Sequence, residues 1–331
     1  MFLTIAIPSH NKSYLLNQAL NSIIDEGDFN EEIDILISDN SPSNDIKDLY
    51  DRKFSKQKKI NLIDSSKFSC LDSNVNRSVE ASKGEYVWIF GDDDLIVPGS
   101  IISIIRHLKK HKPSILVVNS QSFNQNGIIE KKRVPIKNNL VYGAEENDIF
   151  LANFGSYLTY LGAIVVKKNL WMENFDNAKI GSYFAHLDVL FKLKRNRIAH
   201  FLSKDCIKMR LGSQTWTGKS FEIWNIFFAE IIWGLKDYES QSKRKVISKY
   251  PFHSPKTLLA SRVYGRLSFK IWKKTIIKSK KISTSFKLFI LLICLIPRNF
   301  LKFPYKFIIW NIRKKHTLTF SPALALAQLD L

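Results

Sequence analysis

Three adjacent carboxylates, Asp92 to Asp94, follow a nearly uninterrupted apolar run in the sequence KGEYVWIFGDDDLIVPG. The run from Tyr86 to Phe90 has the pattern of a short strand that is buried on both faces. Adjacent carboxylates repel one another unless positive charge lies between them, so we expect no folding energy from them until a cation binds. A hard cation such as Mg²⁺ or Mn²⁺ suits such oxygens. The alternative is a solvated turn, and the position after a buried strand favours the metal site.

Strands and helices alternate along the chain around these acids. Apolar runs and helical spacing predict strands at 3–7, 33–37, 60–63, 86–90, 114–120 and 162–166, helices at 13–24, 45–50, 73–82, 101–111 and from 186, and a hairpin turn at 124–127. This order predicts an α/β fold with a doubly wound, mostly parallel sheet. Ligands of such sheets bind beyond the carboxyl ends of the strands, where Pro8-Ser9-His10, Ser38-Asp39-Asn40 and Gly91 to Asp94 fall.

Asp39 stands just past the end of a predicted strand. Its carboxylate could accept a hydrogen bond from a nucleobase N–H or a ribose hydroxyl, or it could cap the next turn. Together with Asp92 to Asp94 on a neighbouring strand end, it outlines a sugar-nucleotide pocket. In this pocket the base lies near Asp39 and the diphosphate lies over the metal.

Composition predicts a folded protein with one large domain and an appendage, because the chain has 331 residues of which 45% are hydrophobic. Cys70, Cys206 and Cys294 lie far apart, which indicates a reducing compartment and argues against a disulfide scaffold or a zinc site. The first residues, MFLTIAIPSHNKSY, have no basic n-region and too short an apolar run for a signal peptide. We therefore expect a cytosolic catalytic face.

The net charge of +20 is concentrated near the end of the chain. From Pro255 to Leu331 there are sixteen Lys or Arg residues and one acid, Asp330, so this segment carries +15 of the total. A uniformly basic fold would suggest nucleic acid, whereas a basic tail suggests an anionic surface that the tail alone touches. The polar stretch 237–251 interrupts the α/β pattern and predicts a domain boundary there.

The three acidic and polar segments occur in the pattern IAIPSHNKSYLLNQALNSI…ILISDNSPSND…SNVNRSVEASKGEYVWIFGDDDLIVPGSI. This pattern resembles the inverting nucleotide-diphospho-sugar glycosyltransferases of family 2, which have the GT-A fold. It is most similar to the bacterial abequosyltransferase-like branch that builds O-antigen and capsule units. The resemblance covers residues 1–120 well and 150–235 loosely. It implies a catalytic domain over 1–240, with a nucleotide-sugar-binding part at 1–120 and an acceptor-binding part at 121–240.

The resemblance also implies roles for individual residues. Pro8 and His10 line the base pocket, Asp39 bonds the nucleobase, and Asp92 and Asp93 fill the positions that hold ribose and metal, with Asp94 beside them. Asp93 and Asp94 are the implied ligands of Mg²⁺ or Mn²⁺. Further candidates for the pocket are Lys67, Arg77, Arg210 and Trp216, and each of these is also consistent with a surface or packing role. Two positions depart from the family pattern, since Gly91 stands where many relatives have Asp and His10 where Tyr is usual.

An inverting transfer needs a general base that takes the proton of the acceptor hydroxyl. The family usually supplies an Asp at the start of a helix near residue 190, where this sequence reads SYFAHLDVLFKL. His186 occupies that position, and Asp188 follows two residues later. Histidine suits proton transfer near neutrality, so His186 and Asp188 are both candidates for the base. Alternatively, His186 caps or packs the helix and Asp188 is a surface acid.

Residues 241–331 form the predicted basic amphipathic region. The apolar run Leu288 to Ile296 ends at Pro297 and is too short to span a bilayer. Lys and Arg interleave with Phe, Trp, Tyr and Ile around it, which suits an interfacial helix on anionic lipid at the cytoplasmic face of the bacterial inner membrane. The alternative is a helix packed on the catalytic domain. No nucleic-acid-binding motif accompanies the charge.

The resulting hypothesis is a glycosyltransferase that moves a sugar from a nucleotide-diphospho-sugar donor to a glycan acceptor. The acceptor is expected to be lipid-linked, and the pathway is expected to build a surface polysaccharide. The alternative from another class is a non-catalytic membrane or nucleic-acid adaptor built on the same sheet.

Overall fold

The computed structural model describes residues 1–27, 32–130, 132–175, 180–192, 197–213, 219–279 and 282–302. Within these residues the chain forms one ten-stranded sheet with the order β3-β2-β1-β4-β9-β6-β10-β5, in which β7 also pairs with β6 and β8 with β10. The strands are β1 (Leu3–Ser9), β2 (Ile33–Asp39), β3 (Ile60–Asp64), β4 (Tyr86–Ile89), β5 (Leu95–Ile96), β6 (Ile115–Asn124), β7 (Gly127–Glu130), β8 (Leu140–Tyr142), β9 (Ile164–Lys167) and β10 (Ala199–Arg210).

Most strands of the sheet point in the same direction. β1 is parallel to β2 and β4, β2 is parallel to β3, and β6 is parallel to β10. β9 is antiparallel to both β4 and β6. β6 and β10 therefore run in the same direction as β1 to β4. The predicted α/β fold with a mostly parallel sheet is confirmed. As a consequence, the carboxyl ends of β1, β2 and β4 meet at one edge, where Ser9 lies opposite Asp39 in the strand register.

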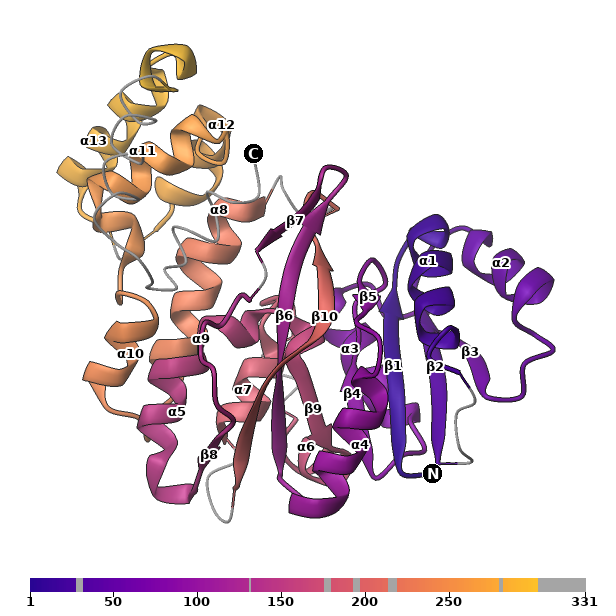
Figure 1. Ribbon diagram of the computed structural model, residues 1–331. Helices are drawn as coiled ribbons and strands as arrows, with labels where there is room; N and C mark the ends of the chain where they lie inside the picture. The colour runs from indigo at the N-terminus through magenta and orange to yellow at the C-terminus, as the bar shows by residue number, and fades with distance from the viewer. Residues whose placement is uncertain are drawn as a thin grey trace.

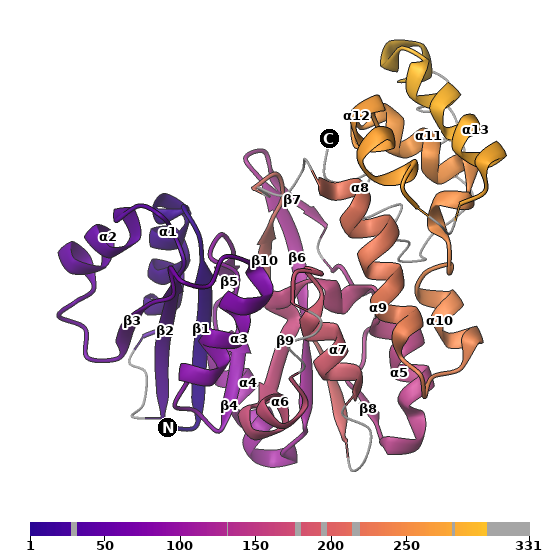
Figure 2. The ribbon, with the colours of Figure 1, turned by 180° about the vertical axis from the view of Figure 1, so that it is seen from behind.

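Helices cover both faces of this sheet, as the two opposite views show (Figures 1 and 2). They are α1 (Ser13–Ile24), α2 (Asp45–Lys53), α3 (Leu71–Ala81), α4 (Ser100–His111), α5 (Asn147–Phe154), α6 (Lys168–Asn174), α7 (Ala185–Lys192), α8 (Ser220–Glu222), α9 (Phe228–Gly234), α10 (Ser240–Val246), α11 (Pro255–Val263), α12 (Phe269–Ile271) and α13 (Thr284–Leu295). A π-helical turn, η6 (Ile223–Phe227), joins α8 to α9.

Alternation along the strands produces two apolar cores, one on each face of the sheet. On β1, Leu3, Ile5 and Ile7 pack with α1, α2 and α4, whereas Ala6 packs on the opposite face with α3, α7 and α9. The helix predicted at 13–24 has the observed bounds of α1, and the predicted strands lie within one to four residues of the observed ends.

β10 is the main element that the sequence pattern did not predict. Its residues alternate between the two cores at first, with Phe201 on one face and Leu202 on the other. The register with β6 then shifts between Leu202 and Asp205 and again before Ile207. These irregularities interrupt the period of two from which a strand is recognised. The strand ends at Arg210, which donates hydrogen bonds to Asp93 and Asp94.

Helices α11 to α13 form a separate layer beyond α8, away from the sheet (Figure 1). They enclose a small apolar core of their own, and α8 contributes Phe221 to it. Among the described residues, no helix is long and apolar enough to cross a membrane. The remaining basic residues of the predicted tail, 303–331, lie outside the described residues.

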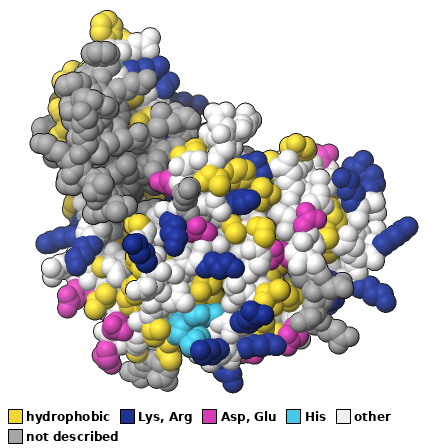
Figure 3. Space-filling view, viewed as in Figure 1, with side chains coloured by type: hydrophobic (Ala, Val, Ile, Leu, Met, Phe, Trp, Pro, Cys, Tyr) yellow, Lys and Arg dark blue, Asp and Glu magenta, His cyan; other side chains and the backbone are white. Residues whose placement is uncertain are grey.

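The charged side chains of the described surface are mixed in sign. In the view of Figure 3, acidic and apolar side chains lie among the Lys and Arg side chains, and several Lys and Arg side chains gather beside the His side chains in the lower part of the view.

Candidate active site

A cavity of about 600 Å³ opens at the carboxyl ends of β1, β2 and β4, where a sheet of this topology binds its ligands. Both halves of the predicted catalytic domain, residues 1–120 and 121–240, contribute polar and aromatic side chains to its lining. The first half supplies Pro8, Ser9, His10, Lys12, Asn40, Asn74 and the loop Gly91–Asp94, and the second supplies Glu130, Arg133, Tyr160, Tyr183, Arg210 and Trp224 among others.

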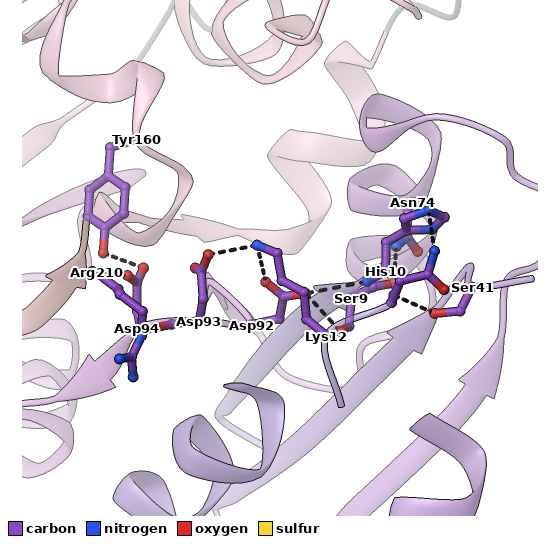
Figure 4. Close-up of polar contacts among 11 residues, drawn as sticks. Ser9, His10, Lys12, Ser41, Asn74, Asp92, Asp93, Asp94, Tyr160 and Arg210 are labelled. Atoms are coloured by element: carbon purple, nitrogen blue, oxygen red, sulfur yellow. Dashed lines mark hydrogen bonds and ion pairs between the residues drawn. The ribbon is translucent and has the colours of Figure 1, made fainter. Parts of the chain in front are cut away.

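The acidic loop, Asp92 to Asp94, is held rigidly at its first residue. Asp92 is 8% exposed, and its Oδ2 accepts hydrogen bonds from Ser9 Oγ at 2.8 Å and from the His10 backbone N–H at 3.3 Å. Burial raises the pKa of Asp92, and the nearby charge of Lys12 opposes this effect. The loop is thus fastened to the end of β1, and Asp92 Oδ1 is directed toward Lys12 (Figure 4).

Asp94 is built into the protein rather than exposed at a loop apex. Its side chain is 2% exposed, Oδ2 accepts from the Tyr160 hydroxyl at 2.6 Å, and Oδ1 accepts from the Arg210 backbone N–H at 2.9 Å. Burial raises the pKa of Asp94 to about 7, and the charge of Asp93 adds to the effect. The expectation that all three carboxylates contribute no folding energy is therefore wrong for Asp94, because this side chain satisfies two donors in a buried place.

The side-chain ammonium of Lys12 places a positive charge between Asp92 and Asp93. Lys12 Nζ is 3.2 Å from Asp92 Oδ1 and 2.6 Å from Asp93 Oδ2 (Figure 4). Burial lowers the pKa of Lys12, but the charges of Asp92 and Asp93 outweigh burial, so the pKa is raised overall. Among the described residues, no group of three or more His, Cys, Asp or Glu side chains is arranged to hold a metal ion.

A polar network joins the ends of β1 and β2 on the other side of the cavity. His10 Nδ1 lies 3.1 Å from both the backbone oxygen and Oδ1 of Asn40. Asn74, which is buried on α3, donates to the carbonyl oxygens of Ser9 and Ser38 and accepts from Ser38 Oγ at 2.7 Å. The network fixes the imidazole of His10 at the cavity wall, where it offers a flat face and a polar edge.

Several predicted site residues do not line the cavity. Asp39 Oδ1 accepts from the Ser41 N–H at 2.9 Å, which is the turn-capping alternative. Arg77 forms an exposed ion pair with Glu80 on α3, and Lys67 lies 5.4 Å from the ring of Phe68. Trp216 lies outside the described residues. Arg210 lines the cavity, and its Nε donates to the Asp93 carbonyl oxygen at 2.8 Å.

His186 and Asp188, the two candidate bases, are likewise not brought to the cavity. His186 is 3% exposed, and its Nε2 lies 3.1 Å from the Leu158 carbonyl oxygen. Burial lowers the pKa of His186 to about 4, although the contact with Leu158 opposes this effect. Asp188 is also buried and pairs with Lys192 at 2.6 Å. In this conformation both side chains belong to the packing of α7.

A change of His186 to Gln should affect stability rather than turnover. The unfolded chain protonates His186 below its usual pKa of about 6.5, whereas the folded protein resists protonation down to about 4. Stability from this group is therefore present above pH 6.5 and is lost as the pH falls toward 4. Urea unfolding between pH 4.5 and 7.5 should give a shallower pH dependence for His186→Gln than for the wild type. His253→Gln, at an exposed histidine, is the control.

The same variant separates packing from catalysis. Loss of a general base lowers turnover by about 10²- to 10⁴-fold. We expect folded His186→Gln to retain transfer within a few-fold of wild type. A loss in the general-base range, with the fold intact, would restore His186 to that role.

Gly91 has a steric reason to be glycine. A Cβ at this position would lie 2.5 Å from Asp94 Oδ2, because the Asp94 carboxylate turns back over the backbone of the loop. Gly91→Ala should displace that carboxylate and destabilise the fold by about 1–3 kcal/mol, as overpacking does. Gly143→Ala is a matched control, since its nearest atom would be Glu146 Oε2 at 3.9 Å. Equal urea midpoints for the two variants would contradict this steric account.

A clamp that the sequence did not reveal lies between α3 and the segment before α7. Asp72, buried on α3, accepts from the backbone N–H groups of Gly181 and Tyr183 at 2.9 Å and from that of Ala185 at 3.2 Å. Tyr183 has a φ of 68°, which is rare for a residue other than glycine, and it lines the cavity. The clamp therefore holds a strained backbone that presents Tyr183 to the site.

Other residues missed in the sequence include Lys12, Asn74, Tyr160 and Trp224. Trp224 lies in the π-helical turn η6, and such turns frequently occur at functional sites. The sequence could have indicated Lys12, because it lies two residues from His10 in the first polar segment. Asn74 lies 34 residues from its cavity partner Asn40, and Tyr160 lies 66 residues from Asp94, so sequence proximity gave no signal for them.

Comparison with known proteins shows which proteins this chain resembles. Residues 4–160 match the model of glycosyl transferase family 2. Over 233 residues the chain is 24% identical to the abequosyltransferase RfbV of Salmonella typhimurium. The match covers 63% of this chain and 67% of RfbV. The resemblance inferred from the sequence is confirmed, and the adaptor alternative is disfavoured.

Solved structures of TarS from S. aureus share the fold. TarS 1–349 superimposes with a TM-score of 0.54 at 15% identity, covering 97% of this chain and 94% of that one. The same segment in complex with UDP-GlcNAc gives a TM-score of 0.52 at 16% identity, with 75% and 71% covered. At this identity the likeness concerns the fold, and it confirms the expected GT-A architecture.

Proposed function

We propose that this glycosyltransferase moves a sugar from a nucleotide-diphospho-sugar to an acceptor in the biosynthesis of a bacterial surface polysaccharide. One observation carries the proposal: within a family 2 domain, a single cavity combines an acidic loop at the end of β4 with a polar wall at the ends of β1 and β2. The names of the relatives support the substrate class, since one is an abequosyltransferase and another was solved with UDP-GlcNAc.

The donor would lie along the strand ends. His10 and Pro8 offer a wall for the base, and Asn40 offers amide and carbonyl groups beside it. Asp39 adjoins this wall, and its Oδ1 accepts from the Ser41 N–H, so a bond from the base to its other carboxylate oxygen is part of the proposal. The diphosphate would then extend toward Asp92 and Asp93.

Dependence on Mg²⁺ or Mn²⁺ is also proposed, because the available oxygens fit a hard cation. Asp93, with Asp92 Oδ1, would hold it, since Mg²⁺ and Mn²⁺ sites with phosphate ligands need only one or two carboxylates from the protein. Asp94 fits less well, because Tyr160 and Arg210 already occupy its two oxygens. When bound, the metal would neutralise charge on the leaving diphosphate.

Inversion at the anomeric carbon follows from family membership as an expectation. It needs a general base within reach of the acceptor hydroxyl. Neither His186 nor Asp188 lines the cavity in this conformation. The stability and turnover measurements on His186→Gln described above test whether His186 takes part in the reaction. Nuclear magnetic resonance of the product's anomeric configuration tests inversion directly.

Attachment to the cytoplasmic face of the inner membrane, where a lipid-linked glycan would be presented, completes the proposal. α13 is apolar on both sides. Ile290, Ile293 and Cys294 pack inward, whereas Leu292 and Leu295 are each 62% exposed. A helix that is apolar all round and uncovered on one side indicates a partner for that side. Lys287 within α13 and Arg298 and Lys302 after it add positive charge, which favours anionic lipid.

Nucleotide binding tests the function at its first step. We expect the full-length protein to bind at least one of UDP, GDP, CDP, dTDP and ADP in calorimetry, and to bind it more tightly with Mn²⁺ or Mg²⁺ than with EDTA. Turnover of the matching sugar nucleotide should follow. Absence of binding to every nucleoside diphosphate with either metal would overturn the proposed function.

A further inference from the structure

Lys12 stands at an electrostatically unfavourable position for a cation. It directly precedes α1, whose N-terminus carries the positive end of the helix dipole. Its side chain is 18% exposed, and its ammonium contacts two carboxylates of the acidic loop, 80 and 81 residues later in the chain. Such a placement indicates that the carboxylates, rather than the helix, determine where this ammonium lies.

Backbone geometry directs Lys12 toward the loop. The preceding residue, Asn11, has a φ of 55°, in the left-handed region that Asn tolerates better than most residues. Its N–H donates to Ser41 Oγ at 2.8 Å, which fixes the turn against the segment after β2. The chain thus reverses between His10 and α1, and Lys12 extends back to Asp92 and Asp93 (Figure 4).

The oxygens of the acidic loop are almost fully assigned. Asp92 Oδ2 accepts from Ser9 and His10, and both oxygens of Asp94 accept from Tyr160 and Arg210. Asp92 Oδ1 and Asp93 Oδ2 are held by Lys12 alone among the contacts described above. A divalent cation bound by Asp92 and Asp93 would share Asp92 Oδ1 with the ammonium, and its charge would lie beside that of Lys12 whichever oxygen of Asp93 it used.

We propose that Lys12 is an internal counter-ion of the acidic loop, which a divalent cation must displace, and that the displaced ammonium then binds the donor diphosphate. The inference rests on the proposed function. Lys12 keeps the loop in shape before the donor binds, and it makes binding of the metal alone weak. The donor removes this barrier, because its diphosphate supplies new anionic oxygens for the ammonium. Metal and donor are therefore expected to bind cooperatively.

Mn²⁺ binding without nucleotide tests the proposal on the full-length protein. We compare the wild type with Lys12→Met, Lys12→Arg and the control Lys47→Met, an exposed lysine on α2, by the electron paramagnetic resonance of free Mn²⁺. Removal of a positive charge this close to a divalent cation should tighten Mn²⁺ binding by about tenfold or more. Lys12→Arg and Lys47→Met should bind as weakly as wild type.

A double variant tests whether the gain in Mn²⁺ affinity depends on the Asp93 carboxylate. Adding Asp93→Asn to Lys12→Met should abolish the tighter binding, because it removes a carboxylate that both cations use. If Lys12→Met does not fold, Lys12→Gln serves in its place, since the amide still donates to one carboxylate without the charge. Mn²⁺ binding by the folded charge-free variant that is no tighter than wild type would overturn the proposal, as would a gain that survives Asp93→Asn.

The nucleotide titrations separate this inference from the proposed function. If the wild type binds a nucleoside diphosphate with Mn²⁺ but the charge-free variant gains no Mn²⁺ affinity, the counter-ion role is wrong and the transferase function stands. If the variant gains Mn²⁺ affinity but no nucleoside diphosphate binds, the competition is supported and the donor assignment is wrong.

Discussion

Asp93→Asn should lower glycosyl transfer by about 10²- to 10³-fold, the range seen when a single group that stabilises developing charge is removed. Asp93 lines the cavity and pairs with Lys12 at 2.6 Å, and it is the acidic-loop residue best placed to hold a divalent cation. The amide retains the shape of the side chain but loses its charge. Initial rates with donor and acceptor, measured over a range of Mn²⁺ concentrations, check this expectation.

Stability measurements on the same variants give the contrasting result. Asp93→Asn should lower the free energy of unfolding by about 1 kcal/mol or less, because it weakens one ion pair of Lys12 while the pair with Asp92 remains. Asp94→Ala should cost about 1–3 kcal/mol, because it leaves the Tyr160 hydroxyl and the Arg210 N–H without their acceptor. Asp51→Asn, on the exposed face of α2, is the control for both assays. If Asp93→Asn retained wild-type transfer at all metal concentrations, the acidic loop would have only a structural role.

Replacement of Leu288, Leu292 and Leu295 by Ser should nearly abolish binding to anionic vesicles. These residues follow helical spacing on one side of α13 and are 55%, 62% and 62% exposed. A buried leucine side chain contributes about 1.5–3 kcal/mol, so partial insertion of three should make a difference on the order of 10²-fold or more in partitioning. Sedimentation with vesicles of phosphatidylglycerol and phosphatidylethanolamine measures the effect.

A matched control uses equally exposed apolar residues elsewhere. Ile102, Val141 and Ile149 are 51%, 59% and 53% exposed on the sheet region, and their replacement by Ser should leave vesicle binding unchanged. Binding of the wild type should also weaken with salt, because each nearby Lys or Arg contributes about 1 kcal/mol that ions screen. Equal sedimentation of both triple variants would show that α13 does not mediate membrane attachment, and its exposed side would need a protein partner.

The sequence by itself determined the architecture, because local patterns carry that information. Apolar runs with polar ends predicted the first strands, and helical spacing predicted α1 with its observed bounds. The parallel order of these strands places their carboxyl ends together, so Pro8, His10 and the acidic loop could be assigned to one site without coordinates. The family resemblance rested on the same segments.

Tertiary structure alone decided how the members of the site are used. Burial separates Asp94 from Asp93 although the two are adjacent, since Tyr160 and Arg210 approach the loop from parts of the chain 66 and 116 residues away. Packing of α7 likewise places His186 against Leu158 rather than in the cavity. A divalent metal ion was predicted at the acidic loop, and that stays a prediction. The structure places the ammonium of Lys12 between the first two carboxylates. Sequence patterns report the environment of near neighbours, whereas contacts of this kind depend on long-range approach, which only the folded chain specifies.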